Sequence, residues 1–202
     1  MTISRPCGRR AAKRGSAMTG LIILIIVVGA AGYAVVLYNS LVRNRQLGQE
    51  GWSGIDVQLK RRTDLIPNMI ETVKGYMGHE RETLEAVVKA RADATAAASA
   101  SPEQRAAAEG ALSGALGKLL AIAEAYPDLK ANTTFLEFQE ALQTVEDEIQ
   151  LSRRYYNGAV RNLNVAVESF PSNVIANAFK FEKMEYFELE NAADRAVPTV
   201  KF

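Results

Sequence analysis

The sequence has only one cysteine, Cys7, and one histidine, His79, among its 202 residues. A single cysteine cannot form an intramolecular disulfide, so the fold must be stable without one. One histidine is too few for a di-iron bundle, which needs paired histidines at fixed spacing from glutamates, and the zinc motif HExxH does not occur. We therefore predict no metal site and no cofactor.

Recognisable catalytic motifs are also absent from the sequence. His79 begins HERETL, which resembles the phospho-accepting helix of sensor kinases, but Leu84 stands where that motif needs proline and no glycine-rich ATP-binding region follows. The nucleophile elbow GxSxG, the Walker loop and the dinucleotide fingerprint are missing as well. We predict a non-enzymatic protein with no catalytic residues.

The chain lacks a strong net charge. The formal net charge is +1, with 23% charged residues. A protein that binds nucleic acid through its phosphates usually carries a clear excess of basic residues. Nucleic acid is therefore not an expected partner.

One long stretch near the N-terminus has no charged side chain. Between Arg14 and Arg43 no Asp, Glu, Lys or Arg occurs, and Gly20 to Tyr38 reads GLIILIIVVGAAGYAVVLY. About 20 apolar residues are needed to cross a bilayer as a helix. We predict a transmembrane helix over residues 18–38, in a single-pass protein of the cell membrane. The alternative is a cleaved secretory signal, although the apolar run continues beyond the small residues of GAAGYA.

Residues 1–17 form a basic extension that we expect to be disordered. Its five basic residues and lack of acids predict a cytoplasmic N-terminus by the positive-inside tendency, which puts the remaining domain outside the cytoplasm. Translation from Met18 would remove these charges and favour the opposite orientation. Both topologies stay open at this stage.

Residues 39–180 have the apolar spacing of long helices. Between Trp52 and Met77 the apolar residues recur at steps of three, four or seven, which places them on one helix face. Asn39 to about Ser99 reads as one long helix or two collinear ones. Pro67 either kinks it or starts a second segment capped by Asp64. Gly75 and Gly78 are a further weak point.

Two more helices follow. Ser101, Pro102 and Gln104 form a start signal with a capping box, and this helix should end near Ala125. Its glycines at 110, 114 and 117 indicate either close helix contact or a helix of moderate stability. The next helix, capped by Asn132 or Thr133, has a regular stripe, and Ser172 can cap a short helix after it. The stripe consists of Phe135, Phe138, Leu142, Val145, Ile149, Ser152, Tyr156, Ala159, Leu163 and Ala166.

The expected fold class is therefore all-α: a single N-terminal transmembrane helix followed by an antiparallel bundle of long helices. Residues 181–202 show no clear periodicity, and we expect a mostly irregular tail.

Arg61 and Arg62 are the candidate interaction surface. Arg62 has no acidic residue three or four positions away, and Asp64, which is three positions after Arg61, can pair with Lys60 instead, so each arginine needs water, another helix or a partner. A guanidinium suits carboxylates and lipid phosphates. The competing interpretation is an ion pair inside the bundle with Glu146, Asp147 or Glu148.

Five segments together resemble the LemA family, over nearly the whole chain from about Met18 onward. They are YNSLVRNR (38–45), WSGIDVQLKRRTDLIPNMIETVKGYMGHE (52–80), EAYPDLKAN (124–132), RRYYNGAVRNLN (153–164) and FPSNVIA (170–176). The resemblance implies a membrane-tethered bundle of long antiparallel helices without an established enzymatic activity. Relatives include a magnetosome-associated membrane protein and others thought to work with membrane proteins or proteases.

Two functions are consistent with these observations. In the first, the protein is a non-enzymatic scaffold that recruits or organises membrane proteins. This scaffold can be a monomer or a homo-oligomer. In the second, it is an accessory or regulatory subunit of a membrane enzyme such as a protease.

Overall fold

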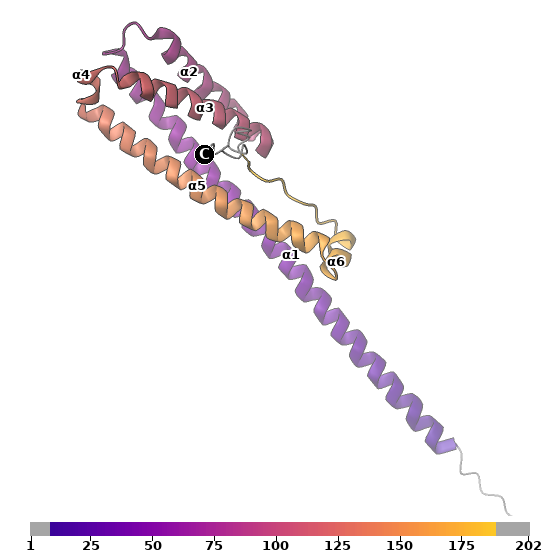
Figure 1. The fold of residues 1–202 in the computed structure, drawn as a ribbon. Coiled ribbons are helices and arrows are strands. Elements are labelled where there is room, and N and C mark those ends of the chain that lie inside the picture. Colours follow the sequence, from indigo (N-terminus) through magenta and orange to yellow (C-terminus); the bar gives the residue numbers. More distant parts are fainter. Residues whose placement is uncertain (1–8, 189–202) are drawn as a thin grey trace, which may run out of the picture. The chain divides into compact units, whose positions relative to one another are not determined.

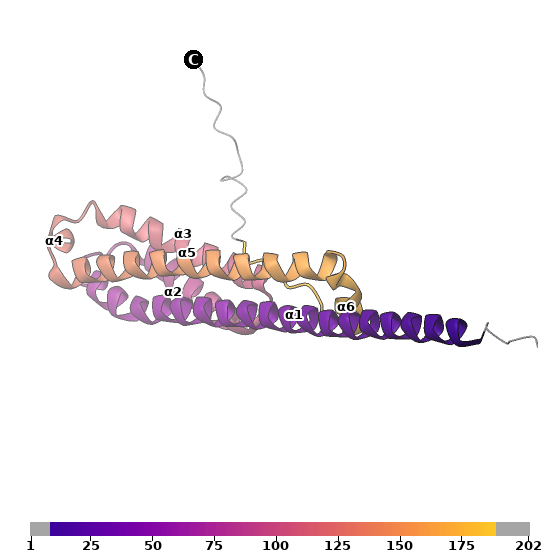
Figure 2. The same ribbon diagram turned by 90° about the horizontal axis from the view of Figure 1, so that it is seen from below.

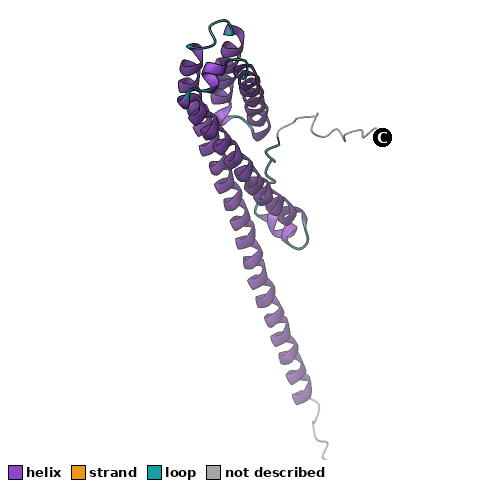
Figure 3. Cartoon of the chain, turned by 60° about the vertical axis from the view of Figure 1, so that its left-hand side comes forward, coloured by secondary structure: helices purple, strands orange, loops and turns teal. Residues whose placement is uncertain are grey.

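The computed structural model describes the backbone of residues 9–188 and the side chains of residues 18–188. Its elements, shown in Figures 1 and 3, are α1 (Arg9–Lys74), α2 (Arg81–Ala96), the 3-10 turn η1 (Ala97–Ser99), α3 (Pro102–Ala123), α4 (Pro127–Lys130), α5 (Thr133–Glu168) and α6 (Ser172–Ala178). No strand occurs within residues 9–188. The predicted all-α class is confirmed.

The chain divides into two compact units. One contains the chain up to Arg43 together with residues 165–182, and we call it the membrane unit. The other contains residues 44–164 and the chain from Lys183, and we call it the bundle unit. The bundle unit and the bundle range expected from the sequence, residues 39–180, have residues 44–164 in common.

The bundle unit contains four long helical segments that alternate in direction. Arg105 and Glu109 of α3 contact Asp56 and Arg62 of α1 respectively, so these two helices run the same way. Tyr155 of α5 lies beside the N-terminal part of this α1 segment, at Glu50, whereas the earlier α5 residue Glu146 reaches Arg62. α5 is thus antiparallel to α1, and α2 returns along it from a short turn (Figure 2). The result is an up-down-up-down four-helix bundle.

The first helix ends at its glycines and not at its proline. α1 passes through Pro67 and continues to Lys74, so the predicted second segment capped by Asp64 is wrong. A proline inside a helix costs one hydrogen bond, about 3 kcal/mol, but buried Ile66 and Met69 on either side hold this turn against the core. The helix stops at Gly75, and α2 turns back, so the expected helix or collinear pair to Ser99 is also wrong.

The bundle core consists of two apolar clusters. Ala90, Ala94 and Ala106 are buried where α2 packs on α3, so small side chains allow these two helices to pack closely. The α5 stripe is confirmed, because its large apolar members face the core. Cluster one contains Ile66, Met69, Ile70, Val73, Met77, Leu84, Val87, Leu112, Leu116, Leu119, Leu129, Phe135, Phe138 and Leu142, with three alanines. Cluster two contains Ile55, Leu59, Ala106, Val145, Ile149, Tyr156, Val160 and Phe187.

The predicted helix starts are confirmed. The Ser101 hydroxyl accepts a hydrogen bond from the Gln104 amide at 3.3 Å, with Pro102 as the first residue of α3. The Asn132 side chain accepts one from the Phe135 amide at 3.0 Å and so caps α5. α3 ends at Ala123, close to the expected Ala125.

Close helix contact occurs at Gly51 of α1 and not at Gly114 or Gly117 of α3. An added Cβ would meet nothing within 4 Å at Gly114 or Gly117, so the close-contact interpretation is wrong there. At Gly51 on α1 a Cβ would lie 3.0 Å from the Cα of Tyr156. The two long helices α1 and α5 therefore come together at Gly51, where only a hydrogen fits.

Residues 183–188, which we call the strap, return along α5 in an irregular conformation. Asn164 donates to the Met184 carbonyl and accepts from its amide, both at 2.9 Å. Asn157 does the same with Phe187, at 3.1 and 2.9 Å. Seven helical residues rise about 10.5 Å and three extended residues span about 10 Å, so the two spacings match. The predicted irregular tail is seen in residues 181–188, although this part is tightly bound; residues 189–202 lie outside the described range.

The membrane unit contains the apolar stretch of α1. Within Met18–Lys74 an 18-residue window has a mean hydropathy of 2.7, and none of it is buried. Apolar side chains are more stable in contact with lipid than exposed to water. The same test marks Pro102–Ala123, at a lower hydropathy of 1.3, but the leucines of α3 form part of the bundle core. The first stretch supports membrane anchoring.

The end of α5 and α6 form a tight hairpin in the membrane unit. It contains a cis Phe170–Pro171 peptide bond. The Ser172 hydroxyl donates to the carbonyls of Ala166 and Ser169, at 2.6 and 2.9 Å. Ser172 is the first residue of α6 and Pro171 its N-cap, so the predicted capping role of Ser172 is wrong.

The N-terminal extension is described only in part. α1 begins at Arg9, so residues 9–17 are helical where disorder was expected. Residues 1–8 lie outside the described range.

Candidate functional site

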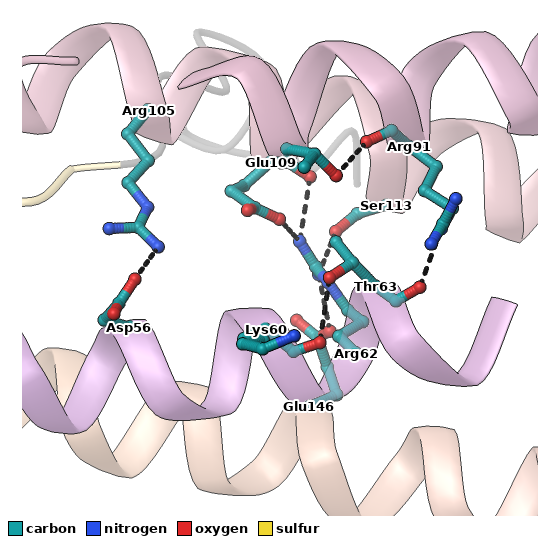
Figure 4. A network of polar contacts seen from close by, with 10 residues as sticks. Asp56, Lys60, Arg62, Thr63, Arg91, Arg105, Glu109, Ser113 and Glu146 are labelled. Carbon is teal, nitrogen blue, oxygen red and sulfur yellow. Dashed lines mark hydrogen bonds and ion pairs between the residues drawn. The ribbon is translucent and has the colours of Figure 1, made fainter. Parts of the chain in front are cut away.

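Arg62 is the centre of a buried polar network in the bundle (Figure 4). Its side chain is 2% exposed and forms ion pairs with Glu109 of α3 and, at 3.0 Å, with Glu146 of α5. It also donates to the Ser113 hydroxyl at 2.8 Å and to the Glu109 carbonyl at 3.3 Å. One guanidinium therefore links three helices, which its fixed fork of donors allows.

A second arginine links α3 to α1. Arg105 is 3% exposed, pairs with Asp56 and lies 5.3 Å above the centre of the Trp52 ring. Asp56 therefore bonds across the bundle and not to Lys60 on its own helix, whereas the Lys60–Asp64 pair on the surface does form, at 2.9 Å. A cation over tryptophan and against a carboxylate is stabilised from both sides.

A third arginine connects α2 to the same region of α1. Arg91 donates through Nε to the carbonyl of Thr63 at 2.8 Å. Figure 4 shows Arg105 and Arg91 extending from neighbouring helices to the segment of α1 that carries Asp56, Arg62 and Thr63. Together the three arginines fix the register of α1 against α2, α3 and α5.

The prediction for Arg62 as part of an outward surface is wrong, because a side chain buried among three helices cannot meet a partner. The competing interpretation correctly named Glu146 but missed Glu109. A signal for both residues was present in the sequence. Arg62 fills the seven-residue gap between Leu59 and Ile66 in the α1 stripe, and Glu109 continues the α3 stripe back from Leu112. Charged residues at core positions indicate a buried pair.

Arg61 remains on the surface. It is exposed, and among the described residues it forms no ion pair. Of the two candidate interaction residues, it is the one whose role as a contact stays a prediction.

An open groove lies between the end of α1 and α2, which we call the α1–α2 groove. Its volume is about 530 Å³. Met77, Leu84 and Val88 contribute apolar surface, and Val88 is 49% exposed. The full lining consists of Lys74, Met77, Gly78, Arg81, Leu84, Glu85, Val88, Lys89 and Ala92. Three cations and one acid surround an apolar floor, a combination that suits an amphipathic segment with acidic flanks.

A second surface pocket, beside the strap, is polar and basic. It has a volume of about 470 Å³ and includes Arg153, Arg154 and Arg161 of α5. Arg153 bonds to Gln150 at 3.1 Å and lies 5.6 Å above the Phe187 ring, while its Nε is buried without a hydrogen-bond partner. Burial lowers the pKa of Arg153, an effect that the charge of Glu146 opposes. Such a pocket can accept an anion.

Metal binding has no geometric basis in the described part of the chain. No group of three or more His, Cys, Asp or Glu side chains there is placed to hold an ion. His79 is exposed in the turn between α1 and α2.

Residues 51–202 match the sequence model of the LemA family. The chain belongs to the LemA family. The matched residues contain all four bundle helices, the buried arginine network and the hairpin. The resemblance inferred from the five sequence segments is confirmed.

Curated relatives of this LemA family protein align over most of its length. It is 24% identical to magnetosome protein MamQ 2 of Paramagnetospirillum magneticum, over 89% of this chain and 75% of the relative. It is 23% identical to magnetosome protein MamQ of Magnetospirillum gryphiswaldense, over 93% and 79%. Protein LemA of Metamycoplasma hominis is 27% identical, over 83% and 77%.

Proposed function

We propose that this LemA family protein is a non-enzymatic, membrane-anchored helical scaffold that recruits membrane proteins through the α1–α2 groove. The observation that supports the proposal is the groove itself: an apolar floor at Met77, Leu84 and Val88 with Lys74, Arg81 and Lys89 around it. Val88 is the exposed apolar side chain of this floor, whereas Met77 and Leu84 are buried beneath it, and an apolar groove with a charged rim suits a partner helix.

The chemistry of the groove defines the partner. An amphipathic helix can lay its apolar face into such a groove, with its anchoring side chains spaced by one turn. Acidic residues beside them would meet the cations of the rim, which favours fast and selective association. The partner segment is therefore an acidic amphipathic helix of a membrane protein.

α1 connects this recruitment to the membrane. It is a single helix from Arg9 to Lys74, so the apolar stretch and the groove-forming residue Lys74 belong to one element. A partner bound at Lys74 is tethered to the bilayer through that helix. Tethering raises the effective concentration of the partner for other proteins of the same membrane.

The experiment uses the full chain in its native membrane, with a photo-crosslinking amino acid at Val88. Leu151 on α5 is the matched control, because it is also a half-exposed apolar residue of the bundle unit, 54% exposed against 49%. We expect a defined crosslinked product from Val88 and much less from Leu151. Equal products from both positions would refute the groove as the contact site.

A charge reversal tests the role of the rim. Lys89→Glu should weaken crosslinking at Val88 severalfold, since the reversed charge repels an acidic segment. Lys118→Glu is the matched control, an exposed lysine on α3 outside the groove. If the two reversals act alike, net charge and not the groove governs association.

The identity of the crosslinked protein separates the remaining functions. A second copy of the chain defines a homo-oligomeric scaffold. A membrane enzyme, such as a protease, whose activity changes with Lys89→Glu defines an accessory subunit instead. Another membrane protein with no change in any activity defines a recruiting scaffold.

For the topology we propose a cytoplasmic N-terminus and a bundle outside the cytoplasm of a single-pass protein, when residues 1–17 are translated. The basis is the five basic residues before the apolar stretch. Ser101→Cys in a Cys7→Ser background should react with a membrane-impermeant thiol reagent in intact cells. Labelling only after lysis would reverse the topology.

A further inference from the structure

Three large apolar side chains of the α5–α6 hairpin stay exposed, and we call them the hairpin patch. Phe170 is 82% exposed, Val174 56% and Phe179 60%. Isolated exposed apolar residues are common on proteins, but three within ten residues, two of them aromatic, form a surface that usually has an occupant.

The segment that contains the patch has no acidic residue. Between Glu168 and Glu182, Lys180 is the only charged side chain, and the polar residues are serines and asparagines. Carboxylates are costly near hydrocarbon and are repelled by anionic headgroups, whereas a lysine extends its ammonium group to the phosphates. This composition fits a lipid interface better than a water-exposed loop.

The patch adjoins the end of the membrane helix. Tyr38 closes the apolar stretch of α1, and its ring centre lies 4.8 Å from that of Phe179 and 5.7 Å from that of Phe181. These residues all belong to the membrane unit. Figure 2 shows α6 beside α1 in that unit. Aromatic rings gather at the boundary between hydrocarbon and headgroups, which is the level that Tyr38 marks.

We propose that the hairpin patch inserts into the lipid headgroup region as a second membrane contact, beside the span of α1. Continuity with the span favours lipid over a second copy of the chain as the occupant. A lone membrane helix is free to rotate about its axis, and its tilt is set by its neighbours and anchors. A contact to one side of α1 fixes that rotation, so the patch orients the protein on the membrane.

The experiment measures the depth of spin labels on the full chain, in vesicles of phosphatidylcholine and phosphatidylglycerol. Nitroxides are attached at Phe170→Cys and Val174→Cys in a Cys7→Ser background. Two residues of α1 with nearly the same exposure are the controls: Ile25, 63% exposed in the span, and Val57, 62% exposed in the bundle unit. Collision rates with oxygen, which partitions into lipid, and with a water-soluble nickel chelate give the depth. Circular dichroism checks that each variant keeps its helices.

We expect the patch labels to lie between the two controls, with an oxygen-to-chelate ratio below that at Ile25 and severalfold above that at Val57. A ratio equal to that at Val57 would mean that the patch is in water, and the proposal fails. Labels shielded from both reagents would mean that protein, such as a second copy, covers the patch, and the proposal also fails. The test does not involve the α1–α2 groove, so its result is independent of the scaffold function.

Discussion

Arg61 and Arg62 are adjacent in sequence and opposite in environment, so the same substitution at each tests the buried network. Arg62→Met removes the guanidinium from Glu109, whose side chain is 4% exposed, and leaves that carboxylate buried. Breaking a buried pair in this way costs roughly 3–5 kcal/mol. Glu146 adds little to the cost, because it is 34% exposed and water can solvate it. Arg61→Met should change stability by less than about 0.5 kcal/mol, as an exposed substitution does.

The double variant Arg62→Met/Glu109→Leu separates the charge effect from the loss of packing. It removes both buried charges, and apolar side chains of similar size in place of a buried pair are often neutral, within about 1 kcal/mol of the parent. Urea unfolding of the full chain in uncharged detergent, followed by its helical circular dichroism, gives the three free energies.

We expect the single Arg62 variant to be the least stable of the three and the double variant to recover most of the loss. Equal stability of the two single variants would refute the buried network. A double variant less stable than Arg62→Met would show that the side chains contribute mainly by packing and not through their charges.

Three further predictions concern the contacts between α1, α5 and the strap. Gly51→Ala should destabilise the bundle by about 1–3 kcal/mol, because its Cβ would meet the α5 backbone. Gly114→Ala is the matched control: its Cβ would meet no other atom, so this substitution should stabilise the bundle by about 0.5–1 kcal/mol. The same urea assay measures both changes. Asn157→Leu removes two hydrogen bonds to Phe187, each contributing about 1 kcal/mol, so hydrogen exchange of the Phe187 amide should accelerate while α2 amides are unchanged. Burial, and to a smaller extent the charge of Glu185, raises the pKa of Tyr156 from 10.0 to about 12. Folding therefore favours the protonated phenol, and the free energy of unfolding should fall as the pH rises from about 10 to 12. Tyr156→Phe should abolish this contribution to the fall.

Much of the fold could be predicted from helical periodicity alone. The α5 stripe, the Ser101 cap and the apolar span are local patterns, and local patterns survive in the structure. The end of α1 was harder to predict, because Pro67 and the Gly75–Gly78 pair are both helix breakers. Buried neighbours decide between them, and burial depends on helices far away in sequence.

The contact residues were less predictable than the helices. The sequence spacing predicted no ion-pair partner for Arg62 on its own helix, and its actual partners on α3 and α5 are remote in sequence. No regular structure could be predicted for the strap, because its conformation is fixed by hydrogen bonds to two asparagines of α5 and not by a pattern in its own residues. The α1–α2 groove depends on α2 turning back, so it was hidden once α1 and α2 were read as collinear.

The contact between Trp52 and Phe187 sets the order in which the bundle can be completed. Their rings lie 5.7 Å apart, yet nearly the whole bundle separates them along the chain. Contacts between such distant residues form late, since the intervening loop must be closed first. The part of α1 that carries Trp52 is therefore synthesised well before Phe187, which packs against the Trp52 ring. The fluorescence of Trp52, the only tryptophan, should thus change when Tyr156 and Arg105 pack against it and again when Phe187 docks.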